Sequence, residues 1–261
     1  MKIATWNINS VKARLPHLVE WLQSSAPDVV LLQETKCLEE AFPFEPLEDL
    51  GYNISVYGQK TYNGVAILSK YPLEDVTKGM PSFSEDPQAR YIEAVTNQVR
   101  VASVYVPNGQ EVGSEKFAYK MAFYEALFKH SQTLLTLDEA IVLGGDYNVA
   151  PFPEDMHNPT LSGTDRILCS VQEQNQLRRL FNSGYQDGLR LTHPIHLEKS
   201  HSLFTWWDYR AGSFDQNKGY RIDHLLLSPQ AADRTLDADV DTTPRGWQRP
   251  SDHTPVLVKL S

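Results

Sequence analysis

Several features are scarce in this chain of 261 residues, and each scarcity excludes a class of protein. Only two cysteines are present, Cys37 and Cys169, so we expect two free thiols in a reducing compartment and no disulfide framework. The purely aliphatic runs, such as Val29–Leu32, are far shorter than the roughly 20 residues that span a bilayer. Residues 1–7 lack the apolar core of a secretory signal. We therefore expect a cytoplasmic protein without a membrane partner.

An excess of positive charge is also missing. The net charge is -9, which taken alone argues against a polyanionic partner such as nucleic acid. Two segments, 39–49 and 233–241, carry all but one of these net negative charges. The rest of the chain is nearly neutral, so the objection is weak. We expect both acidic segments to lie away from any surface that binds a polyanion.

The chain has no low-complexity linker, repeat or break in composition, so residues 1–261 are expected to form one domain. Hydrophobic periodicity predicts helices at 12–25, 115–135 and 170–182. It predicts strands at 3–8, 28–33, 52–57, 65–69, 91–96, 99–106, 140–143, 203–208, 221–227 and 255–260. Several neighbouring strands are joined by connections too short for a parallel crossover. The pattern therefore predicts mixed sheets in an α/β fold.

Polar side chains lie at the ends of six apolar strands. The acids, amides, phenol and imidazole at these positions belong to Asn7, Asn9, Glu34, Tyr105, Asn108, Asp146, Asn148, Asp223, Asp252 and His253. If the sheets bring those ends together, the side chains converge on one pocket. Their oxygens suit a hard divalent cation such as Mg²⁺ or Mn²⁺. No group of cysteines and histidines has the spacing of a zinc site.

Each of these residues also has a simpler interpretation. Asn9 fits a turn, Asp223 fits a structural ion pair with an arginine, and His253 fits an ordinary surface histidine. Glu34 is harder to explain in this way, because it ends a buried run and an unpaired buried carboxylate is costly. The joint pattern favours a functional site.

Seven short motifs occur in an order and spacing that resemble one known family. They are Thr5-Trp6-Asn7-Ile8-Asn9, Leu32-Gln33-Glu34-Thr35-Lys36, Asn63-Gly64-Val65-Ala66, Tyr105-Val106-Pro107-Asn108-Gly109, Gly145-Asp146-Tyr147-Asn148, Arg221-Ile222-Asp223 and Ser251-Asp252-His253. The family is the exonuclease III branch of the apurinic/apyrimidinic endonucleases, in the endonuclease/exonuclease/phosphatase superfamily. The segment Phe204-Thr205-Trp206-Trp207-Asp208-Tyr209-Arg210, followed by Gly219, narrows the resemblance to the DNA-repair branch.

The resemblance implies a four-layered α/β sandwich, in which two packed mixed β-sheets are flanked by helices as in deoxyribonuclease I. It implies a phosphodiesterase that depends on Mg²⁺ (or Mn²⁺) and acts on double-stranded DNA. The implied activities are 3′-5′ exonuclease, 3′-end cleaning and cleavage at abasic sites, leaving a 3′-hydroxyl and a 5′-phosphate. A monomeric enzyme is expected.

The resemblance also implies roles for single residues. Metal-ligand candidates are Asn7, Glu34, Asp146, Asn148, Asp252 and His253. Asp146 would activate or position the attacking water, and Asn148 would support it. His253, oriented by Asp223, would contact the scissile phosphate. Tyr105 and Asn108 would contact the phosphate and its surroundings.

The expected substrate surface is residues 199–221, where cations alternate with aromatic rings. By resemblance, Trp206, Tyr220 and Ile222 would wall the pocket for the flipped-out abasic sugar. At least one of the adjacent Trp206 and Trp207 should face the core. Arg210 is a phosphate-contact candidate, as are Lys116, Lys120, Arg178, Arg179, Arg245 and Arg249.

Leu168 stands beside this expected pocket, where the family varies in side-chain size. A bulky residue there would block an internal abasic nucleotide while leaving 3′-end cleavage intact, so the balance of the two activities stays open. Two other functions stay open as well. One is a superfamily phosphatase acting on small phosphoesters or lipids, and the other is a non-catalytic nucleic-acid-binding module.

Overall fold

A computed structural model describes residues 1–194 and 203–261, so Lys199 of the expected substrate surface lies outside the described residues. The strands form two six-stranded mixed sheets. In spatial order the first sheet contains β11 (Thr235–Val240), β12 (Val256–Leu260), β1 (Lys2–Asn7), β2 (Val29–Gln33), β4 (Val65–Ser69) and β3 (Asn53–Tyr57). The second contains β5 (Glu74–Lys78), β6 (Tyr91–Thr96), β7 (Val99–Tyr105), β8 (Ile141–Asp146), β10 (Asp223–Leu227) and β9 (Gln186–Asp187).

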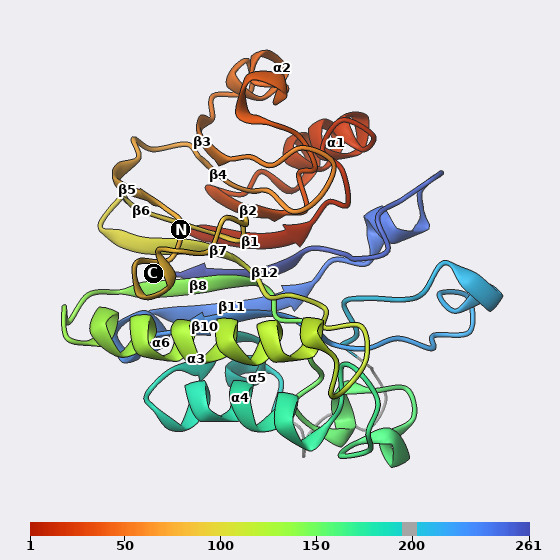
Figure 1. Cartoon of the computed structure of the whole chain (residues 1–261). Helices are drawn as coiled ribbons and strands as arrows, with labels where there is room; N and C mark the ends of the chain where they lie inside the picture. Colours follow the sequence, from red (N-terminus) through yellow and green to blue (C-terminus); the bar gives the residue numbers. More distant parts are fainter. Residues whose placement is uncertain (195–202) are drawn as a thin grey trace.

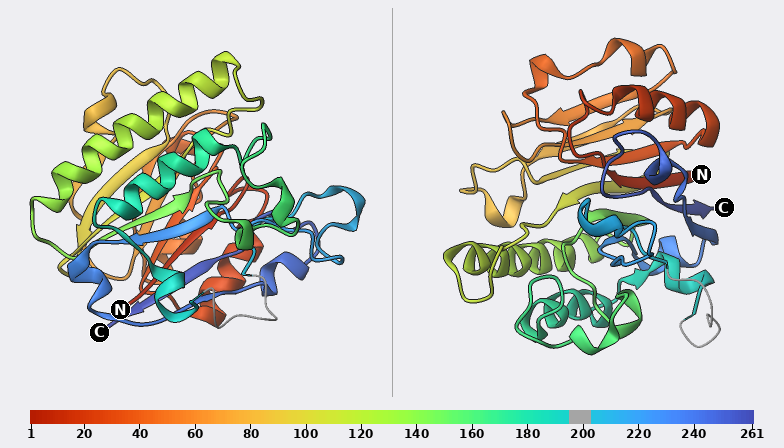
Figure 2. Two further views of the ribbon diagram at one scale, coloured as in Figure 1. Left: turned by 90° about the horizontal axis from the view of Figure 1, so that it is seen from below. Right: turned by 90° about the vertical axis from the view of Figure 1, so that its right-hand side faces the viewer.

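The sheets pack face to face, and helices cover their outer faces (Figure 1). The helices are α1 (Leu15–Ser25), α2 (Glu45–Glu48), α3 (Glu115–Leu135), α4 (Val171–Asn182), α5 (Gly188–Thr192) and α6 (Pro229–Ala232). Figure 1 shows α1 and α2 above the first sheet, and α3 and α4 below the second. Figure 2 shows α3 and α4 side by side. The expected four-layered sandwich is therefore confirmed.

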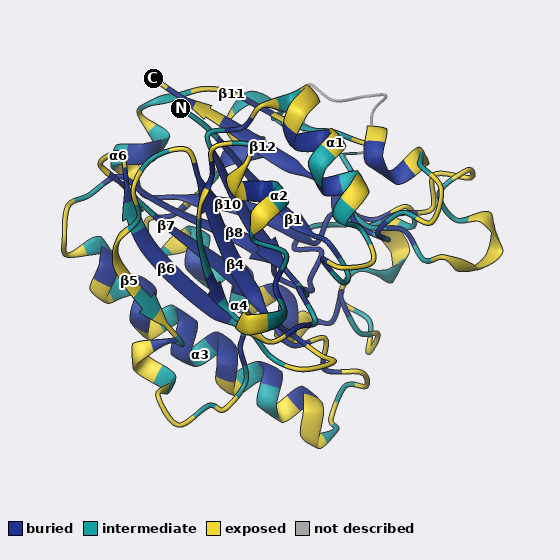
Figure 3. Ribbon diagram, turned by 90° about the horizontal axis from the view of Figure 1, so that it is seen from above, coloured by how far each residue is buried: buried dark blue, intermediate teal, exposed yellow. Residues whose placement is uncertain are grey.

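Burial on both faces explains why the strands are continuously apolar. In β2, Val29 and Leu31 pack into the core between the sheets, whereas Val30 and Leu32 pack into the core beneath α1. Successive strand side chains point to opposite faces, so a strand between two covered faces needs no polar alternation. The inner strands are accordingly buried, and the exposed residues lie on the outer helix faces, the loops and the edge strands (Figure 3).

Local signals set the helix ends close to the predicted positions. The Ser114 side chain accepts a hydrogen bond from the Phe117 amide at the start of α3, and Ser170 and Glu173 form a capping box at the start of α4. Helix α1 begins at Leu15, three residues after the predicted start, with Pro16 in its first turn.

The predicted strand at 203–208 is wrong. Trp206 makes only isolated bridges, one with Tyr220 and one with His253, so this segment is a loop held at single points. Three observed strands, β5, β9 and β11, were not predicted. All three are edge strands. The side chains of β5 and β11 are largely exposed and β9 has only two residues, so these strands show no apolar pattern. Within the described residues, no helix is long and apolar enough to cross a membrane.

Candidate active site

Strand pairing brings the polar strand ends together. In the second sheet, Asp146 at the end of β8 pairs with Tyr105 of β7 on one side and with Asp223 of β10 on the other. In the first sheet, Asn7 at the end of β1 pairs with Gln33, which precedes Glu34. Strands β1 and β8 face each other across the central core, so both sets of ends meet at one edge of the sandwich.

Three side chains at this edge form a group able to hold a metal ion. Ligand atoms of Glu34, Asp146 and His253 all lie within 4.8 Å of one another. The buried Asn7 amide joins the two carboxylates, because its Nδ2 donates to Glu34 Oε1 at 2.9 Å and to Asp146 Oδ2 at 3.0 Å. Paired carboxylate oxygens fit a hard divalent cation such as Mg²⁺ or Mn²⁺.

Glu34 is ionised in this setting. Burial raises the pKa of its carboxyl, but the ammonium of Lys36, at 2.7 Å, and the Asn7 hydrogen bond outweigh burial and leave the pKa lowered. Lys36 Nζ also donates to Asn9 Oδ1 at 2.6 Å. Neither Lys36 nor this role of Asn9 followed from the sequence, although Lys36 stands two residues after Glu34 in the same motif.

His253 and Asp223 form a buried pair. His253 Nδ1 lies 2.9 Å from Asp223 Oδ2, and Thr205 Oγ1 donates to the same oxygen at 2.6 Å. Burial acts to lower the pKa of His253, but the carboxylates of Asp223 and Asp146 outweigh it and raise the pKa to about 10. The imidazole is therefore cationic at neutral pH, with Nε2 free to face the Asp146 side at 3.7 Å.

Within the described residues Asp223 forms its ion pair with His253 and none with an arginine, so the simpler interpretation of this residue is wrong. The neighbouring Arg221 guanidinium instead pairs with Asp155 and Asp187, each at 2.7 Å. This ion-pair network anchors the start of β10 and leaves Asp223 to the imidazole of His253.

Asp146 is buried among like charges. Burial raises the pKa of its carboxyl to about 7, with Asp223 and Glu34 adding to the rise and the His253 cation opposing it. The Asn148 amide donates to Asp146 Oδ1 at 2.9 Å. A carboxyl poised near neutrality can exchange a proton at working pH.

Two amides and a phenol border this carboxylate. Asn148 Nδ2 donates to Asp146 Oδ2 at 3.1 Å, and the exposed Asn108 donates through Nδ2 to Asn148 Oδ1 at 3.0 Å. The Tyr105 ring lies under the guanidinium of Arg90, 4.6 Å from its centre. The pKa of Tyr105 is raised well above its usual value by burial and by Glu34 and Asp146, so the phenol keeps its proton.

Asp252 lies on the opposite side of the site. It accepts from Asn9 Nδ2 at 2.9 Å and from Trp206 Nε1 at 3.0 Å. Burial raises the pKa of Asp252, but the His253 cation and these hydrogen bonds outweigh it and lower the pKa. Asp252 therefore joins the metal-binding edge to the ring expected to wall the substrate pocket.

The expected pocket residues gather beside this edge. Leu168, Trp206, Arg210 and Tyr220 line one cavity of about 550 Å³. Ile222 lies behind that wall, packed against Trp206 and Tyr220, and is 1% exposed. Trp207 is buried, which confirms that one ring of the tryptophan pair faces the core.

Two of the phosphate-contact candidates are wrong. Lys120 is fully buried, and Arg245 is 7% exposed with its guanidinium bonded to the Trp207 carbonyl. A third candidate, Arg179, is half-buried at the surface, where it forms an ion pair with Glu125 at 2.5 Å. Helical position alone did not reveal these contacts, because they depend on which face of each element is covered.

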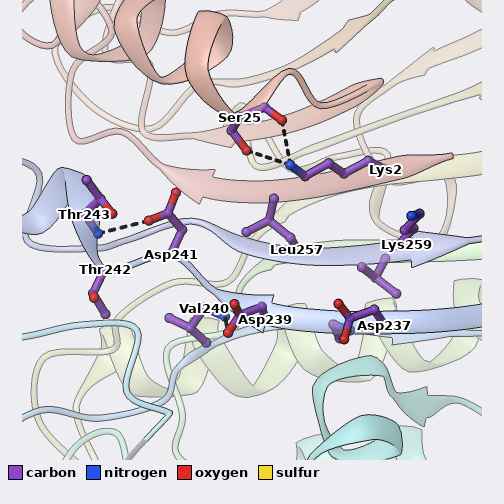
Figure 4. A pocket seen from close by; sticks show the side chains of 12 residues that line it. Lys2, Ser25, Asp237, Asp239, Val240, Asp241, Thr242, Thr243, Leu257 and Lys259 are labelled. Atoms are coloured by element: carbon purple, nitrogen blue, oxygen red, sulfur yellow. Dashed lines mark hydrogen bonds between the residues drawn. The ribbon is translucent and has the colours of Figure 1, made fainter.

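The acidic segment 233–241 lies apart from the catalytic cluster. Asp237 and Asp239 line a separate groove of about 590 Å³ over β11, together with Lys2 and Leu257 (Figure 4). The segment 39–49 includes α2, which lies above the first sheet (Figure 1). Neither segment shares a lining residue with the cavity beside Leu168 and Trp206.

Known proteins match the whole chain. The endonuclease/exonuclease/phosphatase family profile matches residues 4–253. The chain is 34% identical to exodeoxyribonuclease III of Haemophilus influenzae over 100% of both chains. A solved Neisseria 3′ phosphatase bound to a product DNA hairpin has 39% identity and a TM-score of 0.95, covering 100% of this chain and 99% of that one. An AP endonuclease structure from Archaeoglobus fulgidus has 34% identity and a TM-score of 0.94, covering 100% and 99%.

Proposed function

Because the chain belongs to the endonuclease/exonuclease/phosphatase family, we propose that its polar strand ends form the active site of a metal-dependent nuclease on double-stranded DNA. The full-length relatives make it a DNA-repair nuclease of the exodeoxyribonuclease III and AP endonuclease type. The observation that carries the assignment of the site is the convergence of Glu34, Asp146 and His253 within 4.8 Å.

Glu34 and Asp146, joined by Asn7, are the residues that hold the metal, which we propose to be Mg²⁺ or Mn²⁺. A divalent cation bound there supplies positive charge to the phosphate and the leaving oxygen. His253 is a weaker candidate ligand, because a cationic imidazole has no free electron pair for a metal. Asp252 and Asn148 complete the polar lining of the site.

The side chains divide the work of phosphodiester hydrolysis. Asp146 orients the attacking water and accepts its proton. The His253 cation, held by Asp223, donates to a phosphate oxygen and stabilises the charge that develops there. The amides of Asn108 and Asn148 and the phenol of Tyr105 supply further donors. Cleavage in this arrangement leaves a 3′-hydroxyl and a 5′-phosphate.

The cavity lined by Leu168, Trp206 and Tyr220 receives the nucleotide next to the scissile bond, and Arg210 lies at its rim for a phosphate. Leu168 narrows this cavity, and we propose that it favours 3′-end cleavage over internal abasic cleavage. The described side chains of the site all belong to one two-sheet sandwich, which supports a single-domain enzyme, and we propose that it acts as a monomer.

Two end-labelled duplexes test this function. One carries an internal abasic analogue and the other a recessed 3′ end, and each is incubated with Mg²⁺, Mn²⁺ or chelator. We expect metal-dependent cleavage of the recessed end that exceeds cleavage at the abasic analogue, with products that accept polymerase extension. Binding without metal-dependent cleavage would instead indicate a non-catalytic module. Turnover of inositol phosphates without activity on either duplex would indicate a small-phosphoester phosphatase.

A further inference from the structure

A fully buried ion pair lies beneath the side of the site that carries the amides of Asn108 and Asn148, here called the phosphate-side amides. Lys120 of α3 and Glu173 of α4 are both 0% exposed, and Lys120 Nζ donates to Glu173 Oε1. The same ammonium donates to the main-chain oxygen of Asn148 at 2.7 Å and to that of Asn108 at 3.1 Å. An ammonium has three N–H donors, and these three acceptors use all of them.

The carboxylate of Glu173 holds a third loop. It accepts from the Leu168 amide at 3.0 Å, from the Ser170 amide at 3.0 Å and from Ser170 Oγ at 2.6 Å. One ion pair therefore ties the loop of Asn108, the loop of Asn148 and the loop of Leu168 to each other. These are the loops that carry the phosphate-side amides and the narrowing residue of the cavity.

The link from the pair to the reacting groups is short. Asn108 donates to the Asn148 side chain, and Asn148 donates to Asp146, so a shift of either main-chain oxygen moves an amide next to the catalytic carboxylate. A buried ion pair is weak support for stability in itself, because an apolar pair of similar volume is often equally stable. The effect of the ion pair on position is more specific, because the pair holds the three loops in fixed positions relative to one another.

We propose that Lys120 and Glu173 are positioning residues that set the distance between the phosphate-side amides and the Leu168 wall. The pair thereby sets both the turnover rate and the preference between a 3′ end and an internal abasic site. This inference rests on the function proposed above for the same site.

The test separates positioning from stability. Lys120→Met leaves Glu173 buried without its partner, so thermal stability and kcat both fall. The double variant Lys120→Met, Glu173→Gln removes both charges at similar volume, and we expect it to recover most of the lost thermal stability. Its kcat stays ~10- to 100-fold below that of the unaltered enzyme, as expected for misplaced reacting groups, with KM little changed. The ratio of kcat/KM for the two duplexes also shifts.

The matched control is Lys129→Met, which removes an exposed lysine from the same helix and should leave both activities unchanged. If Lys120→Met does not fold, Glu173→Gln alone gives the test. The glutamine keeps a side-chain oxygen that accepts from Lys120, but its NH₂ group stands opposite the Ser170 amide, so two donors face each other. Its kcat should fall and its substrate ratio should shift while the protein stays folded.

Recovery of both stability and kcat in the double variant would overturn the proposal, as would an unaltered substrate ratio in Glu173→Gln. A smaller dependence of DNA binding on salt in Lys120→Met would mean that this lysine contacts phosphate instead. If the unaltered enzyme cleaves neither duplex, the proposed function fails, and that result is distinct from any outcome for the variants.

Discussion

His253 Nδ1 faces both oxygens of Asp223, at 2.9 Å and 3.1 Å, while its Nε2 faces Asp146 across 3.7 Å. The imidazole thus stands between two buried carboxylates that come from adjacent strands of the second sheet. Because Asp223 takes Nδ1, the second ring nitrogen is directed toward the reacting side of the site. His253 precedes β12 of the first sheet, and this relationship explains how it can act beside Asp146 of the second sheet.

Removal of the proton acceptor or of the imidazole should abolish cleavage. Asp146→Asn keeps the shape of the side chain but cannot take a proton from water, and His253→Ala removes the donor to the phosphate. We expect each variant to lose about 10³-fold or more in kcat on the recessed duplex. Thermal unfolding checks that the fold persists. Near-normal turnover in either variant would contradict these roles.

Loss of a metal ligand should change the metal requirement. In Glu34→Gln the amide is a poorer ligand than the carboxylate, so half-maximal activity should need at least about tenfold more Mg²⁺. The titration of activity against Mg²⁺ measures this. Glu39→Gln is the control, because Glu39 is an exposed glutamate paired with Lys78 at the surface. An unchanged Mg²⁺ requirement in Glu34→Gln would show that Glu34 is not a ligand.

A smaller residue at position 168 should admit internal abasic sites. Leu168 has a φ of 74°, a left-handed conformation that glycine adopts without strain, so Leu168→Gly opens the cavity without forcing the backbone. We expect the ratio of abasic-site to 3′-end cleavage to rise several-fold. Competition between the two labelled duplexes in one reaction gives this ratio directly. A constant ratio would mean that other residues set the preference.

Arg210 should contribute to DNA binding through charge. Its side chain is 88% exposed at the rim of the cavity, and its pair with Asp208 is a surface pair that costs little to break. Arg210→Gln should weaken binding and reduce the slope of log affinity against log salt by about one. Arg234→Gln is the control, since Arg234 is a partly exposed arginine that bonds the main-chain oxygen of Ser261 and does not line the cavity. Equal slopes in both variants would show that Arg210 does not contact a DNA phosphate.

Buried His224 should make stability depend on pH. Burial, with the Arg221 cation adding to it, lowers the pKa of His224 to about 4. The unfolded chain binds a proton at His224 near pH 6.5, whereas the folded chain does not. The contribution of neutral His224 to the free energy of unfolding is therefore complete above pH 6.5. As the pH falls toward 4, this free energy decreases by up to about 3 kcal/mol.

Denaturant unfolding at pH 7.5 and pH 5 measures this effect. The loss of stability between these two pH values should be smaller in His224→Gln than in the unaltered protein, because glutamine does not titrate. The difference between the two losses isolates the contribution of His224 from that of the other titrating residues. Equal losses would mean that His224 is protonated in the folded state.

Much of the architecture could be predicted from local pattern. The helix at 115–135 and the strand at 65–69 have the predicted bounds, because periodicity and caps act over a few residues. Edge strand β11 and the loop around Trp206 could not be predicted, since an exposed edge carries no apolar pattern and isolated bridges depend on distant partners. For the same reason, helical spacing on α3 could not tell the buried Lys120 from an exposed lysine.

The sequence by itself determined which chemical groups are present and that they lie at the ends of buried strands, because a strand's burial and its first polar residue are local properties. Only the tertiary structure decided which groups meet. The register of β8 between β7 and β10 places Asp146 beside Asp223, and the packing of the two sheets adds Glu34 and His253. The contacts among Glu34, Asp146 and His253 join residues more than 100 positions apart, so their geometry depends on the packing of the whole sandwich.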